Sequence, residues 1–171
     1  MQRVLELAER ALAEGEFPIA SIVVLGGEVI ATAATAERRE GRFLVHAEYE
    51  ALLQADRLGL PLARRRAAAL YTNLEPCLMC LGAAMTFFLG RLIYALESPS
   101  DGAVGLVSSW QRPRDDFGEY RLPQVEGGVL RGESIRLFRR YVEMHPPGPM
   151  WEWARSLAEL EKDRLARIGH D

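Results

Sequence analysis

Cysteine is scarce in this 171-residue sequence, which contains only Cys77 and Cys80. The two lie three positions apart in one C-x-x-C, a spacing that favours metal or redox chemistry over a structural disulfide. The sequence also lacks any apolar stretch of the roughly 20 residues that a membrane-spanning helix needs. Charged residues interrupt its first turn, so the apolar core of a signal peptide is missing there. We therefore expect a cytoplasmic protein with no membrane partner.

An excess of positive charge is also absent. The 21 Lys and Arg residues stand against 24 Asp and Glu residues, which gives a formal net charge of −3. Such a balance lacks the basic footprint by which proteins bind polyanions. The run Arg64-Arg65-Arg66 is a local basic cluster that could touch phosphate, but a short charge run is more often a solvated surface. Composition therefore argues against a nucleic-acid partner.

The chain is long enough to bury a core within one domain. Apolar periodicity predicts alternating helices and strands along it. We expect helices over 2–14, from 45 to about 58, 77–89, 134–144 and 151–168, and strands over 19–25, 28–35, 67–73, 92–95 and within 122–130. The charged stretch 37–42 has no period, which is typical of a loop. This order predicts an α/β fold, a three-layer α/β/α sandwich in which residues 1–144 form the catalytic domain and residues 145–171 add a Pro-rich break and a helix that packs on it.

Two short motifs carry the candidate chemistry, His46-Ala47-Glu48 and Pro76-Cys77-Leu78-Met79-Cys80. On a helix, residues three apart share a face, so Cys77 and Cys80 can bind one ion. A helix N-terminus also favours thiolate over thiol, which predicts a lowered pKa for both. With His46 as the third ligand, one tetrahedral position stays open for water. An open position is typical of a catalytic zinc site.

Glu48 follows His46 by two positions, which places the two side chains about 200° apart on a regular helix. It is therefore expected to carry protons beside the metal rather than to bind it. A closed structural zinc site and a thioredoxin-like dithiol are the alternatives. The order of the motifs, each at a predicted helix start, argues against both. The other histidines, His145 and His170, have no metal-ligand spacing and are expected at the surface.

From about residue 4 to residue 144 the sequence resembles the cytidine deaminase-like superfamily, especially its branch of tRNA adenosine deaminases, guanine deaminases and small cytosine deaminases. The similarity lies in the blocks 17–20, 46–48, 74–80, 90–94 and 125–130. It implies a five-stranded mixed sheet, here with a C-terminal helical extension, one Zn²⁺ per chain and a homodimer. The implied reaction is hydrolytic deamination, in which zinc-bound hydroxide attacks the carbon that bears an amine and Glu48 moves the protons.

The resemblance also implies a substrate pocket that includes Ile19, Thr35 and the backbone N–H near Ala47. Thr35 stands where the family commonly has Asn, eleven residues before the zinc-binding His. Phe43-Leu44 replaces the common Asp-Pro, which predicts a more apolar pocket mouth. Trp151 and Trp153, after the Pro-rich break, form either an aromatic lid over the substrate or part of the core. Substrate identity depends on these departures.

The preferred interpretation is a zinc-dependent hydrolytic deaminase of a small molecule, namely a free nucleobase, nucleoside or related aminated heterocycle. A tRNA adenosine (A-to-I) deaminase is the rival enzyme; the acidic composition and the extension argue against it. A third hypothesis is a catalytically silent, zinc-stabilised interaction module. Retention of Glu48 beside three metal ligands speaks against that module, because a structural zinc does not need it.

Overall fold

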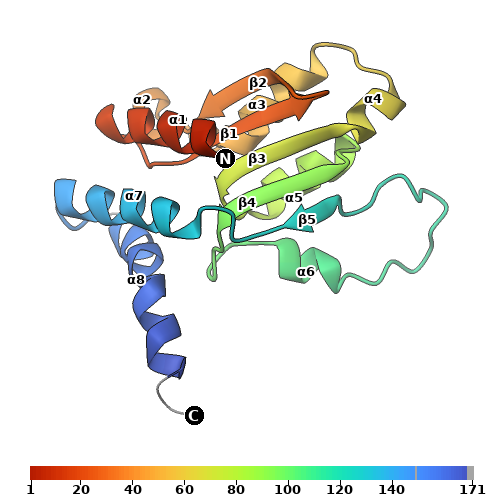
Figure 1. The fold of residues 1–171 in the computed structure, drawn as a ribbon. Helices are drawn as coiled ribbons and strands as arrows, with labels where there is room; N and C mark the ends of the chain where they lie inside the picture. The colour runs from red at the N-terminus through yellow and green to blue at the C-terminus, as the bar shows by residue number, and fades with distance from the viewer. Residues whose placement is uncertain (149, 169–171) are drawn as a thin grey trace.

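Five strands form one mixed sheet in a computed structural model that describes residues 1–148 and 150–168, with side chains as far as residue 160 (Figure 1). The strands are β1 (Ala20–Leu25), β2 (Glu28–Ala34), β3 (Ala68–Leu74), β4 (Arg91–Leu96) and β5 (Gln124–Glu126). Their order is β2-β1-β3-β4-β5. β1 is antiparallel to both β2 and β3, whereas β3, β4 and β5 are parallel. The predicted α/β fold with a five-stranded mixed sheet is confirmed.

Helices cover both faces of the sheet. Figure 1 shows α1 (Gln2–Ala13) and α7 (Arg131–Met144) on one face, with α3 (Ala47–Asp56) and α5 (Leu78–Thr86) on the other. Because successive side chains of a strand point to opposite faces, Ile22 of β1 packs in the α1 and α7 layer and Val23 packs in the α3 and α5 layer. β1 is therefore almost wholly apolar, as expected of a strand that is buried on both sides.

The remaining helices are α2 (Glu37–Glu40), α4 (Leu62–Arg66), α6 (Val104–Ser108) and α8 (Trp151–Ile168). α8 packs against α7, with Ala154 and Leu157 fully buried in the same core cluster as Phe138. Trp151, at the start of α8, is half-buried. Within the described part of the chain, no helix has both the length and the apolar character needed to cross a bilayer.

The stretch 37–42 was predicted to be a loop, and this prediction is wrong, because it contains α2. Glu16, only 2% exposed, accepts hydrogen bonds from the backbone N–H groups of Arg38 (3.0 Å) and Arg39 (2.7 Å). These donors belong to the first turn of α2, where a helix cannot satisfy its own N–H groups. The cap comes from a residue more than 20 positions earlier, so local periodicity does not reveal this helix.

α5 ends at Thr86, earlier than the predicted end near Leu89. Phe88 adopts a left-handed conformation with φ of 62°. The N–H of Leu89 then bonds to the carbonyl of Ala84 (3.0 Å), and that of Phe88 to the carbonyl of Met85 (3.1 Å). This hydrogen-bond pair is a Schellman cap, which closes the helix before Gly90 is reached.

Gly90 occupies a crowded position instead, since a Cβ built there would lie 1.8 Å from the backbone oxygen of Arg66. We predict that Gly90→Ala lowers the free energy of unfolding by about 1–3 kcal/mol, because the backbone must shift. Gly82→Ala in the middle of α5 is the matched control, since beyond the neighbouring residues of its own helix no atom lies within 4 Å of the added Cβ. It should be neutral or stabilising by up to about 1 kcal/mol. Urea denaturation measures the free energy of unfolding of both variants. Equal losses in the two would contradict the crowding described at Gly90.

Candidate functional site

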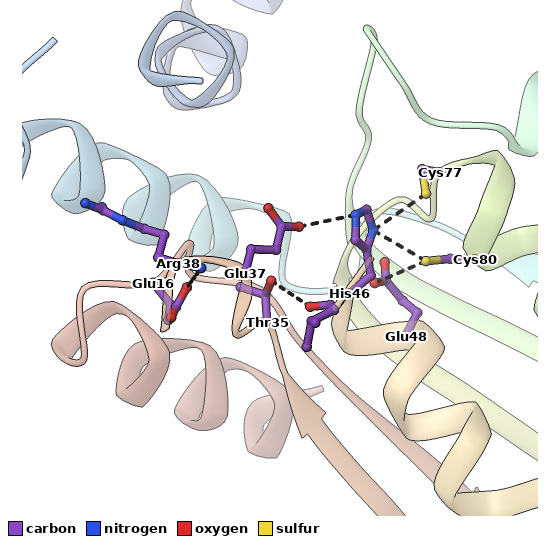
Figure 2. Close-up of polar contacts among 9 residues, drawn as sticks. Glu16, Thr35, Glu37, Arg38, His46, Glu48, Cys77 and Cys80 are labelled. Carbon is purple, nitrogen blue, oxygen red and sulfur yellow. Dashed lines mark hydrogen bonds and ion pairs between the residues drawn. The ribbon is translucent and has the colours of Figure 1, made fainter. Parts of the chain in front are cut away.

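The two motif segments meet where α3 and α5 begin. His46 is the N-cap residue of α3, Cys77 is the N-cap residue of α5, and Cys80 lies in the first turn of α5. His46 Nδ1 is 3.7 Å from Cys77 Sγ and 3.6 Å from Cys80 Sγ (Figure 2). All three potential ligand atoms lie within 4.8 Å of one another. In the part of the chain that the structure describes, this is the one such group close enough to share an ion.

The spacing of these atoms fits zinc. With Zn–S bonds of about 2.3 Å and Zn–N bonds of about 2.0–2.1 Å, a tetrahedral site has N···S edges of roughly 3.6 Å. The two measured Nδ1···Sγ distances match that edge. Thiolate and imidazole are also donors that zinc favours. The residues therefore form a candidate zinc site with three protein ligands, as the two motifs predicted.

Glu48 lies in the first turn of α3, directly beside this group but not within it. Its carboxyl group is almost fully buried, and Oε2 is 3.8 Å from Cys80 Sγ. Burial raises the pKa of Glu48 to about 7, and the nearby His46 opposes that rise. A carboxyl group with a pKa near neutrality can both accept and release a proton. Its position and basicity suit a proton carrier.

The two thiols have opposite pKa shifts in the metal-free chain. A hydrogen bond from Cys80 lowers the pKa of Cys77 to about 4. The pKa of Cys80 is raised, because it donates to Cys77 and is itself buried. The prediction that both pKa values are lowered is therefore wrong for Cys80, since a second thiolate would face the first. The hydrogen bond with Cys77 raises the pKa of His46 to about 9, and the nearby carboxylates add to that rise.

Glu37 is a neighbour of the site that sequence reasoning missed. Its Oε1 lies 3.2 Å from His46 Nε2, the ring nitrogen that faces away from the sulfurs (Figure 2). Burial raises the pKa of Glu37, while His46 opposes that rise. No motif spacing marks this residue, because α2 brings it to the imidazole through a tertiary contact.

A pocket of about 660 Å³ opens above the metal ligands. All four residues predicted to bind substrate line it, namely Ile19, Thr35, Ala47 and Trp151. Ala47 is fully buried, and Thr35 Oγ1 donates a hydrogen bond to the carbonyl of Val45 (3.1 Å). The Thr35 hydroxyl therefore uses its hydrogen in this bond to the segment before His46. Toward the pocket its oxygen can act only as a hydrogen-bond acceptor.

The extension supplies one wall of this pocket. Trp153 contacts Phe17 and Phe138 edge to face, at ring-centroid distances of 5.5 and 5.9 Å, and also lines the pocket. Its Nε1 donates to Asp101 Oδ1 at 3.1 Å. Core packing and contact with the cavity are therefore compatible roles for Trp153. Trp151 Nε1 donates to the carbonyl of His145 at 3.0 Å, which ties the start of α8 to the end of α7.

His145 was expected at the surface, and this prediction is wrong. It is half-buried, lines the pocket and stacks on Tyr141 with ring centroids 4.2 Å apart. Its Nδ1 lies 2.9 Å from the carbonyl of Tyr141, one helical turn earlier. Sequence periodicity could not show that the end of α7 faces the metal site. His170 lies outside the described residues.

A family model described as "Cytidine and deoxycytidylate deaminase zinc-binding region" matches residues 1–96. The chain is 37% identical over 140 residues to a tRNA(Ile)-lysidine synthase of Deinococcus radiodurans, a match that covers 81% of this chain and 23% of that protein. It is 33% identical to a tRNA-specific adenosine deaminase of Bacillus subtilis, covering 78% and 80% of the two chains. The chain thus spans only about a quarter of the length of the lysidine synthases that it matches.

Solved structures show the same relationship. A structure from a study of tRNA:A34 deaminases superposes with a TM-score of 0.65 and 33% identity, covering 80% of this chain and 96% of that one. The guanine deaminase from Nitrosomonas europaea superposes with a TM-score of 0.63 and 29% identity, covering 82% and 81%. Both superpositions include most of the solved chain. The first leaves out a fifth of the present chain.

We predict that zinc affinity rises with pH from about pH 6 to pH 8, because zinc binding must displace protons from His46 and Cys80. Cys77, with its pKa of about 4, is already a thiolate in that range. Near pH 7 binding should therefore release about two protons. Chelator competition measures the affinity, and titration calorimetry in two buffers counts the protons. An affinity independent of pH would refute this account of the metal-free site.

Proposed function

Since the chain belongs to the family of the cytidine and deoxycytidylate deaminase zinc-binding region, we propose that it is a zinc-dependent hydrolytic deaminase of a free nucleobase, nucleoside or related aminated heterocycle. One observation carries this proposal. The buried carboxyl group of Glu48 lies beside His46, Cys77 and Cys80 at a pocket of small-molecule size.

The chemistry needs a nucleophile and a proton carrier. When bound by His46, Cys77 and Cys80, zinc supplies the Lewis acidity that makes water a nucleophile near neutral pH. Glu48 accepts a proton from the attacking water. It delivers that proton to a ring nitrogen of the heterocycle, then takes the remaining proton of the added hydroxyl group and passes it to the departing amine as the C–N bond breaks. The carbon gains oxygen, ammonia leaves, and Glu48 returns to its starting protonation state.

The charges around the pocket favour a substrate without phosphate. Among the described residues that line it, Glu37, Glu48, Glu75 and Asp101 carry carboxyl groups and Arg38 carries a guanidinium. Like charges within a partly buried cavity repel more strongly than in water. A phosphate group would therefore be disfavoured, whereas a neutral heterocycle with N–H donors is not.

Asp101 and the aromatic wall suit such a heterocycle. Asp101 Oδ1 accepts hydrogen bonds from Ser98 Oγ and Trp153 Nε1, so the carboxylate is held in one orientation at the pocket. An ionised carboxylate has acceptor capacity beyond these two bonds, which suits an N–H of the substrate. The rings of Phe17, Tyr141 and Trp153 also line the cavity, and aromatic rings stack or pack edge-on against planar bases.

The rival function is deamination of adenosine in tRNA. The Bacillus subtilis relative and the tRNA:A34 deaminase structure, each 33% identical, favour it. Binding tRNA draws most of its affinity from Lys and Arg contacts with phosphates, and the net charge of −3 offers little for this. A silent zinc-stabilised module is disfavoured by the buried Glu48. The homodimer implied by the resemblance stays a prediction.

We predict that Glu48→Gln lowers turnover by about 10²–10⁴-fold while zinc stays bound, because it removes the proton carrier and keeps the shape. Glu50→Gln, in the same turn of α3 but outside the pocket lining, is the matched control and should keep full activity. Ammonia release measures turnover, and metal analysis measures the zinc content. Undiminished turnover in the Glu48 variant would disprove the proposed mechanism, even in a correctly folded deaminase.

The substrate class has its own test. We expect ammonia from at least one member of a panel of cytosine, guanine, adenine, their nucleosides and aminated triazines, and none from an anticodon stem-loop. The reason is the carboxyl-rich pocket, which disfavours phosphates. Deamination of the stem-loop, with no release from any small molecule, would reject the preferred substrate class in favour of tRNA.

A further inference from the structure

We propose that Glu37 is a positioning residue of the zinc site, whose carboxylate accepts the Nε2–H of His46 and so turns Nδ1 toward the two sulfurs, and that buried Glu16 holds Glu37 in place. The proposal concerns metal binding. It rests on the zinc site and not on the deaminase function.

The geometry around the imidazole supports the first step. Glu37 Oε1 lies 3.2 Å from Nε2, while Nδ1 lies 3.6–3.7 Å from the two sulfurs, so the ring stands between the carboxylate and the thiols (Figure 2). A neutral imidazole carries one proton. If that proton is on Nε2 and donated to Glu37, the lone pair of Nδ1 is free for a metal. A carboxylate in this place fixes both the tautomer and the ring orientation.

The second step is the support of Glu37 itself. α2 has four residues, and its N-cap residue, Ala36, makes no side-chain capping bond. So short a helix is not stable by itself, since nucleation costs more than one turn returns. The two carboxylate oxygens of Glu16 accept the N–H groups of Arg38 and Arg39, which directly follow Glu37. The cap that α2 lacks is therefore supplied by Glu16.

The burial of Glu16 indicates that this contact has a specific role. The residue is 2% exposed, and a carboxylate is costly to bury unless its oxygens are hydrogen-bonded. Here both oxygens bond to backbone of α2. Both bonds join Glu16 to α2, so the buried carboxylate fixes the position of the turn that carries Glu37.

The segment that carries α2 is also closed at its base. Thr35 Oγ1 donates to the carbonyl of Val45 at 3.1 Å, and the N–H of Ala36 reaches the same oxygen at 3.4 Å. His46 is the next residue, so the loop begins and ends beside the metal ligand. Glu16, bonded to α2, and Thr35, bonded to the residue before His46, together hold Glu37 against the imidazole.

The test measures zinc affinity by chelator competition in the 171-residue chain. Glu37→Ala should weaken zinc binding by about 10–100-fold, the usual effect of losing a partner of a ligating histidine. Glu37→Gln keeps an acceptor for Nε2–H and should recover part of that loss. Glu40→Ala is the matched control on the same helix, because Glu40 pairs with Arg42 at the surface instead of with His46. Its affinity should equal that of the parent chain.

A second readout reports the imidazole directly. In ¹⁵N NMR of the zinc-loaded parent, His46 should carry its proton on Nε2, with slow exchange against water. Glu37→Ala should speed that exchange, and Glu40→Ala should not. These results do not depend on turnover. The role proposed for Glu37 can therefore fail while the deaminase function holds, and the deaminase function can fail while the role of Glu37 holds.

The role of Glu16 is tested by a double-mutant cycle. Glu16→Gln replaces one acceptor with a donor that faces a backbone N–H, so zinc affinity should fall in the parent chain. In the Glu37→Ala background the same change should cause no further loss of zinc affinity, because Glu16 acts on the metal site only through Glu37. Parent-like zinc affinity of Glu37→Ala, an equal loss in Glu40→Ala, or additive losses in the double variant would each overturn the proposal.

Discussion

His46, Cys77 and Cys80 meet because α3 and α5 pack side by side on one face of the sheet and present their first residues to each other. The contact joins two segments 31 residues apart in the chain. Two thiolates and an imidazole then balance the charge of a zinc ion, and the three ligands leave one position open. The pocket, the proposed proton carrier Glu48 and the α2 segment are all arranged around that contact.

The grouping of the candidate zinc ligands could be predicted from the sequence because it follows from local spacing. His46, Glu48, Cys77 and Cys80 each fall at a helix start, and a helix start fixes where such side chains point. The strands and main helices were readable for a similar reason, since apolar periodicity follows burial in a two-sided sheet.

What the sequence did not reveal depends on contacts between distant residues. α2 forms because Glu16 reaches Arg38 and Arg39, and Glu37 touches His46 only because α2 exists. His145 belongs to the pocket because α8 folds back onto α7. Membership of the zinc-binding family does not separate the candidate substrates, because the chain is similar both to a tRNA-specific adenosine deaminase and to a guanine deaminase. The proposed substrate class therefore rests on this wall and on the carboxyl groups of the cavity.

His46, Cys77 and Cys80 should hold one zinc ion with one coordination position left open. X-ray absorption at the zinc edge of the metal-loaded chain tests it most directly. We expect two sulfur scatterers at about 2.3 Å and two nitrogen or oxygen scatterers at about 2.0–2.1 Å, one of them exchangeable with solvent. The spectrum should be the same in Glu48→Gln. A second nitrogen or oxygen ligand from the protein in place of solvent, or loss of a scatterer in that variant, would contradict this coordination.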